Sequence, residues 1–205
     1  MPLTLIRRSL ITLICLVLCA CGGGDSNSGG GQDLSSLEKT NVIAIGDSIG
    51  NGFNIATPWP DLLSGKIARE VINTSVTNER TGFGVRVIEG LIEENNPSHV
   101  VILLGTNDAL RNESISNAIN NLQTMVDIAR ARDVIPIVGT LPPLTIGAAE
   151  DRNAREINQG IRRLNNAVIA GVRGALGNGS TIIDGVHPNQ EGQEIIAEAF
   201  AQVFQ

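Results

Sequence analysis

Aromatic residues are scarce in this sequence, because its 205 residues include four Phe, one Trp and no Tyr. The core of a folded domain must therefore be built mainly from Ile, Leu, Val and Ala. Cysteine is also restricted, since the three cysteines are Cys15, Cys19 and Cys21. The chain beyond position 21 cannot form an internal disulfide bond, even in a compartment that would permit one.

Positive charge is low as well: 15 Lys and Arg residues stand against 21 Asp and Glu. Without Arg7 and Arg8, which lie in the amino-terminal segment, 13 basic and 21 acidic residues remain, a net charge of −8. Such an excess of acidic residues argues against a nucleic-acid partner and against electrostatic attachment to anionic lipid.

The first 20 residues have the pattern of an export signal, in which a basic pair precedes the apolar run 10–18. That run is too short to span a bilayer comfortably. The sequence around Cys21 resembles the lipobox of bacterial lipoproteins, where a small residue, here Ala20, precedes the cysteine that is lipidated and begins the mature chain. Cys19 and Cys15 fit this pattern less well because larger residues precede them. An ordinary secretory signal or an uncleaved anchor is the alternative.

Residues 22–36 are Gly, Ser, Asn and Asp with almost nothing apolar. Such a segment cannot bury enough surface to fold and predicts a flexible tether, which we place at 21–38. An acyl chain on Cys21 would hold the protein at the bacterial cell envelope, on the periplasmic side and in the outer membrane.

Alternating apolar patterns predict the fold of the remaining chain. Short apolar runs predict β-strands at 42–45, 71–72, 100–104, 134–138 and 181–183. Helical spacing predicts helices over 57–68, 83–93 and 115–129, and a last helix with buried residues at 195–203. It also predicts a long helix after Pro142-Pro143 whose buried stripe runs from Ile157 through Val168. Pro136 indicates an edge strand or a position whose N–H side is free. The pattern is typical of an α/β domain, a three-layer α/β/α sandwich with a five-stranded parallel sheet.

Polar motifs follow three of these predicted strands. Gly46-Asp47-Ser48 follows the first, Gly105-Thr106-Asn107-Asp108 the third, and Asp184-Gly185-Val186-His187 the last. In open α/β sheets ligands bind at the carboxyl ends of the strands. Taken alone, Ser48 could be a turn residue or a helix N-cap.

Together the motifs contain the groups that acyl transfer requires. Ser48 can be the nucleophile, and His187 can be the base because imidazole titrates near pH 6.5. Asp184 can orient the imidazole, and Asn107 can donate to a developing oxyanion.

The three motifs, in this order, resemble those of the SGNH (GDSL-type) serine hydrolases, and the bacterial thioesterase/lysophospholipase branch in particular. The resemblance implies a flavodoxin-like hydrolase domain over 39–205, with Ser48, Asp184 and His187 as catalytic residues and no cofactor. In the family a glycine N–H joins the Ser48 N–H and Asn107 in the oxyanion hole, but this sequence has Asn78 where the glycine is expected. Asn tolerates the left-handed backbone that glycine supplies.

Other polar residues have simpler interpretations. We expect Asp47 and Asp108 to brace loops, His99 to be structural or solvent-facing, and Trp59 to be a packing residue. A metal site formed by Asp47, Asp108, Asp184 and His187 is one alternative, although it assigns no role to Ser48.

The sequence predicts a monomeric, lipid-anchored serine esterase whose partner is a small acyl-ester substrate. It leaves open a short acyl ester, a lysophospholipid and a thioester. An O-acetylesterase acting on carbohydrate and a non-catalytic envelope binding module are further alternatives.

Overall fold

The structure is a computed structural model, and it describes residues 39–204. The predicted export signal at 1–20, the tether at 21–38 and the lipidation site Cys21 lie outside the described residues.

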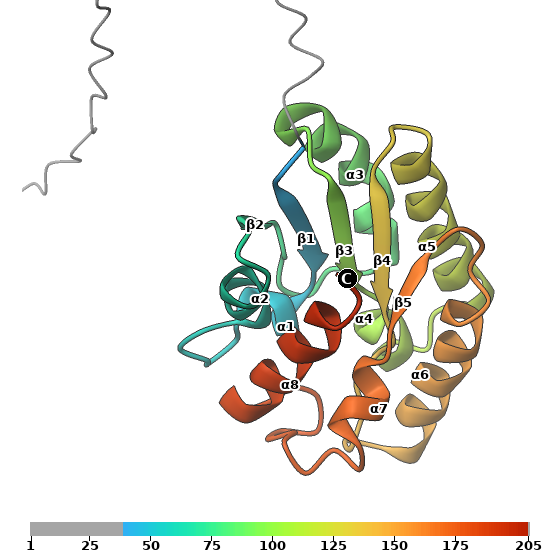
Figure 1. Cartoon of the computed structure of the whole chain (residues 1–205). Coiled ribbons are helices and arrows are strands. Elements are labelled where there is room, and N and C mark those ends of the chain that lie inside the picture. The colour runs from blue at the N-terminus through green and yellow to red at the C-terminus, as the bar shows by residue number, and fades with distance from the viewer. Residues whose placement is uncertain (1–38, 205) are drawn as a thin grey trace, which may run out of the picture. The chain divides into compact units, whose positions relative to one another are not determined.

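Five parallel strands form one sheet, in the order β2-β1-β3-β4-β5 (Figure 1). They are β1 (Val42–Gly46), β2 (Val71–Asn73), β3 (His99–Leu103), β4 (Ile135–Gly139) and β5 (Val168–Ala170). The predicted α/β fold with a five-stranded parallel sheet is confirmed.

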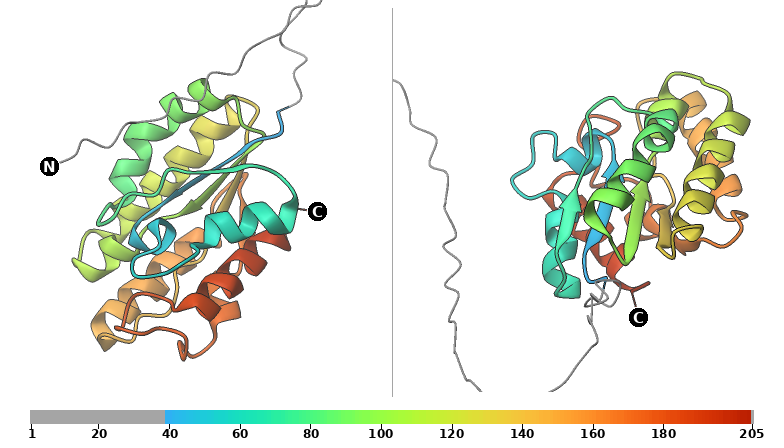
Figure 2. Two further views of the ribbon diagram at one scale, coloured as in Figure 1. Left: turned by 90° about the vertical axis from the view of Figure 1, so that its left-hand side faces the viewer. Right: turned by 90° about the horizontal axis from the view of Figure 1, so that it is seen from above.

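Helices cover both faces of the sheet, which Figure 2 shows edge-on in its left view. They are α1 (Ser48–Asn51), α2 (Trp59–Ile67), α3 (Thr81–Asn95), α4 (Thr106–Leu110), α5 (Ile115–Arg130), α6 (Ala148–Ile161), α7 (Val172–Leu176) and α8 (Gln190–Ala201). Helices α3, α5 and α6 pack against one face, and α2, α7 and α8 against the other.

The first strand shows why the sheet is buried on both sides. Ile43 and Ile45 belong to the core under α3 and α5, while Val42 and Ala44 belong to the core under α2 and α8. All four side chains are fully buried. A run of apolar residues without polar alternation is the pattern that such a two-sided strand requires.

The prediction of a fifth strand at 181–183 is wrong. The fifth strand is β5, and Ile182 makes only an isolated antiparallel bridge to Pro188. The long helix predicted through Val168 is also shorter, because α6 ends at Ile161. Asn166 then adopts a left-handed conformation with a φ of 60°, and the chain turns into β5. The third motif therefore follows a loop and not a strand of the sheet.

Pro136 does not mark an edge strand, since β4 lies between β3 and β5. The Ile135 N–H donates to the Ser98 carbonyl, on the β3 side. Because backbone groups alternate along a strand, the Pro136 nitrogen faces the β5 side, where pairing begins only at Ile137. The alternative interpretation, a position whose N–H side is free, is the correct one.

Candidate active site

The serine of the first motif lies just beyond the carboxyl end of β1. Asp47 caps α1, its Oδ1 accepting a hydrogen bond from the Ile49 N–H at 3.0 Å. Ser48 is the first residue of this four-residue helix and is 8% exposed. Gly52 ends the helix in a left-handed conformation with a φ of 82°. The tight strand-to-helix turn leaves the Ser48 hydroxyl at the carboxyl end of the sheet.

Glycine at position 50 lets a second loop approach the nucleophile closely. A Cβ at Gly50 would lie 2.4 Å from the Ser75 Oγ. The chain after β2 continues along β1, where the N–H groups of Thr74 and Val76 donate to the carbonyls of Ala44 and Gly46. This extension carries residues 77 and 78 to the side of Ser48.

Ser48, His187 and Asp184 form one hydrogen-bonded chain. The Ser48 Oγ lies 2.9 Å from the His187 Nε2, and the His187 Nδ1 lies 2.7 Å from the Asp184 Oδ2. The Asp184 Oδ1 accepts hydrogen bonds from the N–H groups of Val186 and His187, at 3.0 and 2.7 Å. Burial raises the pKa of Asp184, but these backbone hydrogen bonds and the His187 ring outweigh it and hold the pKa below its usual value. Asp184 is therefore an ionised partner for the imidazole.

The loop that carries His187 is held by its own backbone. The Ile183 N–H donates to the His187 carbonyl at 3.0 Å, and the Asn189 N–H donates to the Thr181 carbonyl at 2.7 Å. Gly185 has a φ of 91°, and a Cβ there would lie 2.7 Å from the Cβ of Ile146. Only glycine meets both conditions, which explains its place between Asp184 and Val186.

The predicted oxyanion residues line one cavity with the nucleophile and the base. This cavity has a volume of about 260 Å³ and is lined by Ser48, Phe53, Thr77, Asn78, Asn107, Leu110, Val186 and His187. Asn78 has a φ of 70°, the left-handed conformation expected of a residue that replaces glycine. Its side chain turns to Arg111, whose Nη2 donates to the Asn78 Oδ1 at 3.2 Å.

Asp47 and Asp108, the aspartates of the first two motifs, brace the loops, as expected. Asp108 accepts hydrogen bonds from the N–H and the hydroxyl of Thr81, at 3.0 and 2.7 Å. Asp47 is 1% exposed, and its Oδ2 lies 3.4 Å from the Asn107 Nδ2. Burial raises the pKa of Asp47 to about 6, against the opposing effect of the Ile49 N–H.

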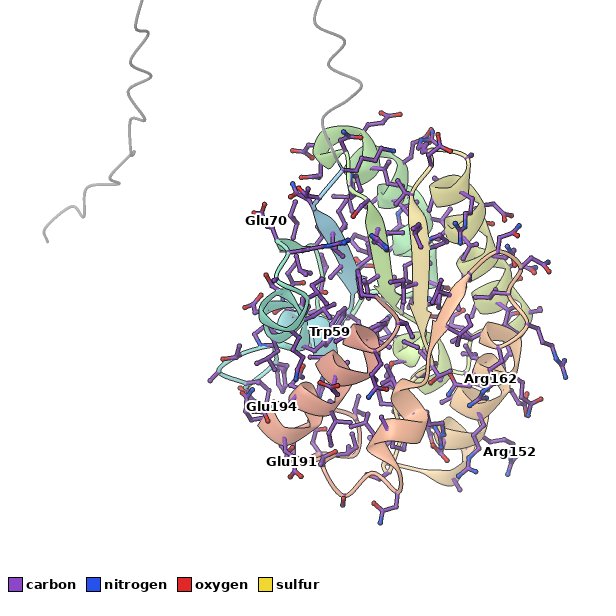
Figure 3. The ribbon with its side chains drawn as sticks, viewed as in Figure 1. Trp59, Glu70, Arg152, Arg162, Glu191 and Glu194 are labelled. Carbon is purple, nitrogen blue, oxygen red and sulfur yellow. The ribbon has the colours of Figure 1, made fainter. Side chains whose placement is uncertain are left out.

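Trp59 and His99 also have the structural roles expected of them. Trp59 is fully buried, and its ring stacks on Phe200 with centroids 4.7 Å apart. Figure 3 places it between α2 and α8. His99 begins β3 and lies against Phe204 with ring centroids 4.9 Å apart. Burial lowers the pKa of His99, which therefore favours the neutral ring.

The four residues of the alternative metal site do not gather. Asp108 is bound to Thr81, and Asp184 to His187. Within residues 39–204, no three His, Cys, Asp or Glu side chains form a group that could hold a metal ion. In the same range, no helix is both long and apolar enough to span a bilayer.

Sequence reasoning missed the apolar wall of the cavity. The Phe53 ring lies against the His187 ring with centroids 4.7 Å apart. Leu110 and Val186 add further apolar surface. The only sequence signal for these residues is their position in or shortly after the three motifs, since they show no periodic pattern.

Curated proteins of similar sequence include two bacterial esterases. An arylesterase of Vibrio mimicus is 27% identical over 143 residues, which are 65% of this chain and 66% of that protein. Esterase TesA of Pseudomonas aeruginosa is 32% identical over 111 residues, which are 50% of this chain and 55% of that protein. The chain thus spans between about half and two thirds of these relatives.

Solved structures share the fold. The crystal structure of TesA has a TM-score of 0.71 at 24% identity and covers 81% of this chain and 98% of its own. The psychrotrophic esterase EstA from Pseudoalteromonas sp. has a TM-score of 0.65 at 22% identity, over 80% of this chain and 96% of its own. The sequence model of the GDSL-like Lipase/Acylhydrolase family matches residues 44–195, which contain all three motifs. The chain therefore belongs to the GDSL-like lipase/acylhydrolase family.

Proposed function

We propose that the protein is a serine esterase that hydrolyses acyl esters through an acyl-enzyme intermediate. The observation that carries the proposal is the hydrogen-bonded chain from Asp184 through His187 to Ser48, which ends in a cavity that Asn107 also lines. A nucleophile, a base and a residue that orients the base are the minimum set for this chemistry.

In the first step the Ser48 Oγ attacks the acyl carbon while the His187 Nε2 takes the hydroxyl proton. The carbonyl electron pair moves to the oxygen and forms a tetrahedral oxyanion. When this pair returns, the bond to the leaving alcohol breaks, and His187 gives its proton to that oxygen. The products are the free alcohol and an ester of Ser48.

In the second step a water molecule replaces the alcohol. His187 removes a proton from the water, the hydroxide attacks the acyl carbon, and collapse of the second oxyanion releases the acid. The proton on His187 returns to Ser48. Asp184 holds the Nδ1–H of the imidazole throughout and stabilises the imidazolium that forms twice in each cycle.

The oxyanion requires donors directed at one point. We assign this role to the backbone N–H groups of Ser48 and Asn78 and to the Asn107 amide. One hydrogen of the Asn107 Nδ2 is held by the Glu79 carbonyl at 2.9 Å. The other faces Asp47 at 3.4 Å, a contact long enough to give way to a charged acceptor.

The size and lining of the cavity favour a short acyl group. About 260 Å³ lined by Phe53, Leu110 and Val186 suits a few carbons and not an extended chain. Lysophospholipids, thioesters and acetylated carbohydrate stay within the proposal as larger substrates whose remaining parts would lie outside the cavity. The lipobox-like sequence at Cys21 supports a site of action at the bacterial cell envelope.

The test is a panel of p-nitrophenyl esters from acetate to palmitate, run beside a lysophospholipid, an acyl thioester and acetylated xylan. We expect turnover of short esters that is lost in Ser48→Ala and that survives a metal chelator. If no member of the panel is turned over by folded protein, the hydrolase proposal is wrong and a binding module takes its place.

A further inference from the structure

A buried glutamine links the helix that follows the base to the segment that follows the nucleophile. Gln193 lies on α8 and is 1% exposed. Its Oε1 accepts a hydrogen bond from the Trp59 N–H at 2.8 Å, and its Nε2 donates to the Ile49 carbonyl at 3.1 Å. Both bonds span more than 130 residues of sequence.

These two bonds satisfy backbone groups that their own helices leave open. Helix α1 has a single turn, so its carbonyls have few partners within the helix. Helix α2 begins after Pro58, which provides no side-chain cap for the first N–H groups. Gln193 thus serves as a cap for both helices, supplied by a third.

A second glutamine, Gln190, lies one turn earlier on α8 and holds the same segment two residues before Trp59. The Thr57 N–H donates to the Gln190 Oε1 at 3.3 Å, and the Gln190 Nε2 donates to the Thr57 carbonyl at 3.1 Å. Figure 3 shows the labelled Glu191 and Glu194 of the same helix pointing outward. The first turns of α8 therefore turn amides toward residues 49–59 and carboxylates toward solvent.

The position of this helix connects the two amides to the catalytic geometry. Asn189 caps α8, its Oδ1 accepting from the Gly192 N–H at 2.9 Å, and it comes two residues after His187. Ile49, at the other end of the link, comes one residue after Ser48. His187 belongs to a loop that pairs with no strand of the sheet, although the Thr145 N–H after β4 donates to the Gly185 carbonyl at 2.9 Å. Helix α8, which begins directly after this loop, is the element that links it to α1.

We propose that Gln193 is a positioning residue that sets the Ser48 Oγ to His187 Nε2 distance. The inference rests on the proposed function for its effect on rate, but the hydrogen bond that it concerns can be measured without turnover. Gln193 touches neither the substrate nor the reacting atoms, and it acts through the two segments that it joins. A small displacement of a catalytic group costs a large factor in rate.

The kinetic test compares Gln193→Met with wild type in the full-length protein. Methionine keeps the length and volume of the side chain but removes both hydrogen bonds. We expect kcat to fall roughly 10- to 100-fold, with a much smaller change in KM. The matched control is Gln202→Met, the same substitution at an exposed position at the end of α8. A purely structural role predicts a lower melting temperature with kcat unchanged well below it, and that result overturns the proposal.

The second test reads the hydrogen bond directly. The sequence has only two histidines, so His187→Gln assigns the ¹⁵N resonances. We expect Ser48→Ala to change the His187 Nε2 chemical shift in the wild-type background but not with Gln193→Met, at a fixed pH where the ring is neutral. Asp184 and Asp47 are the carboxylates whose charge interacts with the His187 ring, and both are unchanged in the two backgrounds. Equal changes in the two backgrounds overturn the proposal.

This pair of tests separates the inference from the function. If the wild-type protein hydrolyses no ester, but Ser48→Ala changes the His187 chemical shift only when Gln193 is present, the hydrolase proposal is refuted and the positioning role is supported. Should Gln193→Met fail to fold, Gln193→Glu keeps the side-chain size and the acceptor for Trp59 and, at a pH where its carboxyl is ionised, has no donor for Ile49. The same chemical-shift comparison then decides.

Discussion

Phe53 lies against His187, with ring centroids 4.7 Å apart and ring planes tilted by 32°. Phe53 comes from the turn after α1 and the residue is 44% exposed, whereas the His187 side chain is 18% exposed. Phe53 therefore covers the imidazole on the solvent side without being part of the core. The contact joins the loop of the nucleophile to the loop of the base.

Removal of this ring should affect rate more than stability. We expect Phe53→Ala to lower kcat roughly 2- to 10-fold, the equivalent of the about 0.5–1.5 kcal/mol that aromatic pairs contribute. Phe53→Tyr should keep most of the activity because it keeps the ring. The control is Ile135→Ala, an exposed apolar residue at the start of β4. A Phe53→Ala enzyme with wild-type kcat would show that the ring is not needed to hold the imidazole.

Ser48 and His187 should act as one unit in kinetics. Each of Ser48→Ala and His187→Ala should lower kcat by several orders of magnitude, and the double variant should be little worse than either. Without its partner, neither side chain can perform its part of the proton transfer. Steady-state kinetics on the three variants checks this, and multiplicative losses in the double variant argue for independent roles.

Asn78 should contribute its backbone N–H and not its side chain. Asn78→Gly should keep most of the activity because glycine reaches a φ of 70° at least as easily. Arg111→Gln is the matched control, since it breaks the Arg111–Asn78 hydrogen bond from the other side. Asn78→Pro, if its melting temperature is retained, should lose roughly 10²–10³ in kcat through the lost donor. A folded Asn78→Gly that is nearly inactive would instead make the side-chain amide the donor.

Asp47 should make stability fall as pH rises through the mildly acidic range. Burial raises its pKa from 3.8 to about 6, so between these values the folded state binds more protons than the unfolded state. The resulting stabilisation is complete below about pH 4 and is lost by somewhat above pH 6, with a magnitude on the order of 3 kcal/mol. Asp47→Asn should therefore gain stability relative to wild type across this range. Urea denaturation at several pH values, with exposed Asp61→Asn as control, measures the difference, and parallel curves would count against it.

Cys21 should determine where the protein is found. Cys21→Ser should move the protein from the membrane fraction to the soluble fraction without changing its specific activity, since lipidation needs the thiol. Fractionation of cells followed by an ester assay tests this. Continued membrane association of the variant would mean that the apolar segment itself is kept as an anchor.

Much of the fold could be predicted because strong local patterns carried it. The continuous apolar runs of β1 and β3 predict buried parallel strands and also the place where the chain leaves the sheet. The fifth strand could not be found this way, because Val168-Ile169-Ala170 and Thr181-Ile182-Ile183 are equally short apolar runs. Leu164 and Val168 also continue the helical spacing of α6 by coincidence. The Asn165-Asn166 pair is the local signal for a turn that ends this spacing, and Asn166 has a φ of 60°.

The residues of the site were predictable to the extent that they occur in motifs. Ser48, Asn107, Asp184 and His187 lie together because the strand ends and one loop bring the motifs to a common edge. Gln193 was not predictable, because its partners lie more than 130 residues away and a glutamine on a helix has no distinctive pattern. Phe53 was missed for a similar reason, since one exposed aromatic residue in a turn is not informative alone.

The pairing of β1 with β3 supports one part of the site and not the other. Gly46 is paired with Leu103, so the ladder of the sheet itself fixes the ends from which Ser48 and Asn107 project. His187 has no such support, because residues 181–189 are bonded to each other, to α8 and, through the Gly185 carbonyl, to the Thr145 N–H of the loop after β4, but not to a strand. The nucleophile and the oxyanion donor thus follow directly from paired strands of the sheet, while the base lies in a loop outside the sheet. Substitutions in the last loop can consequently change or abolish catalytic activity without changing the fold of the sheet.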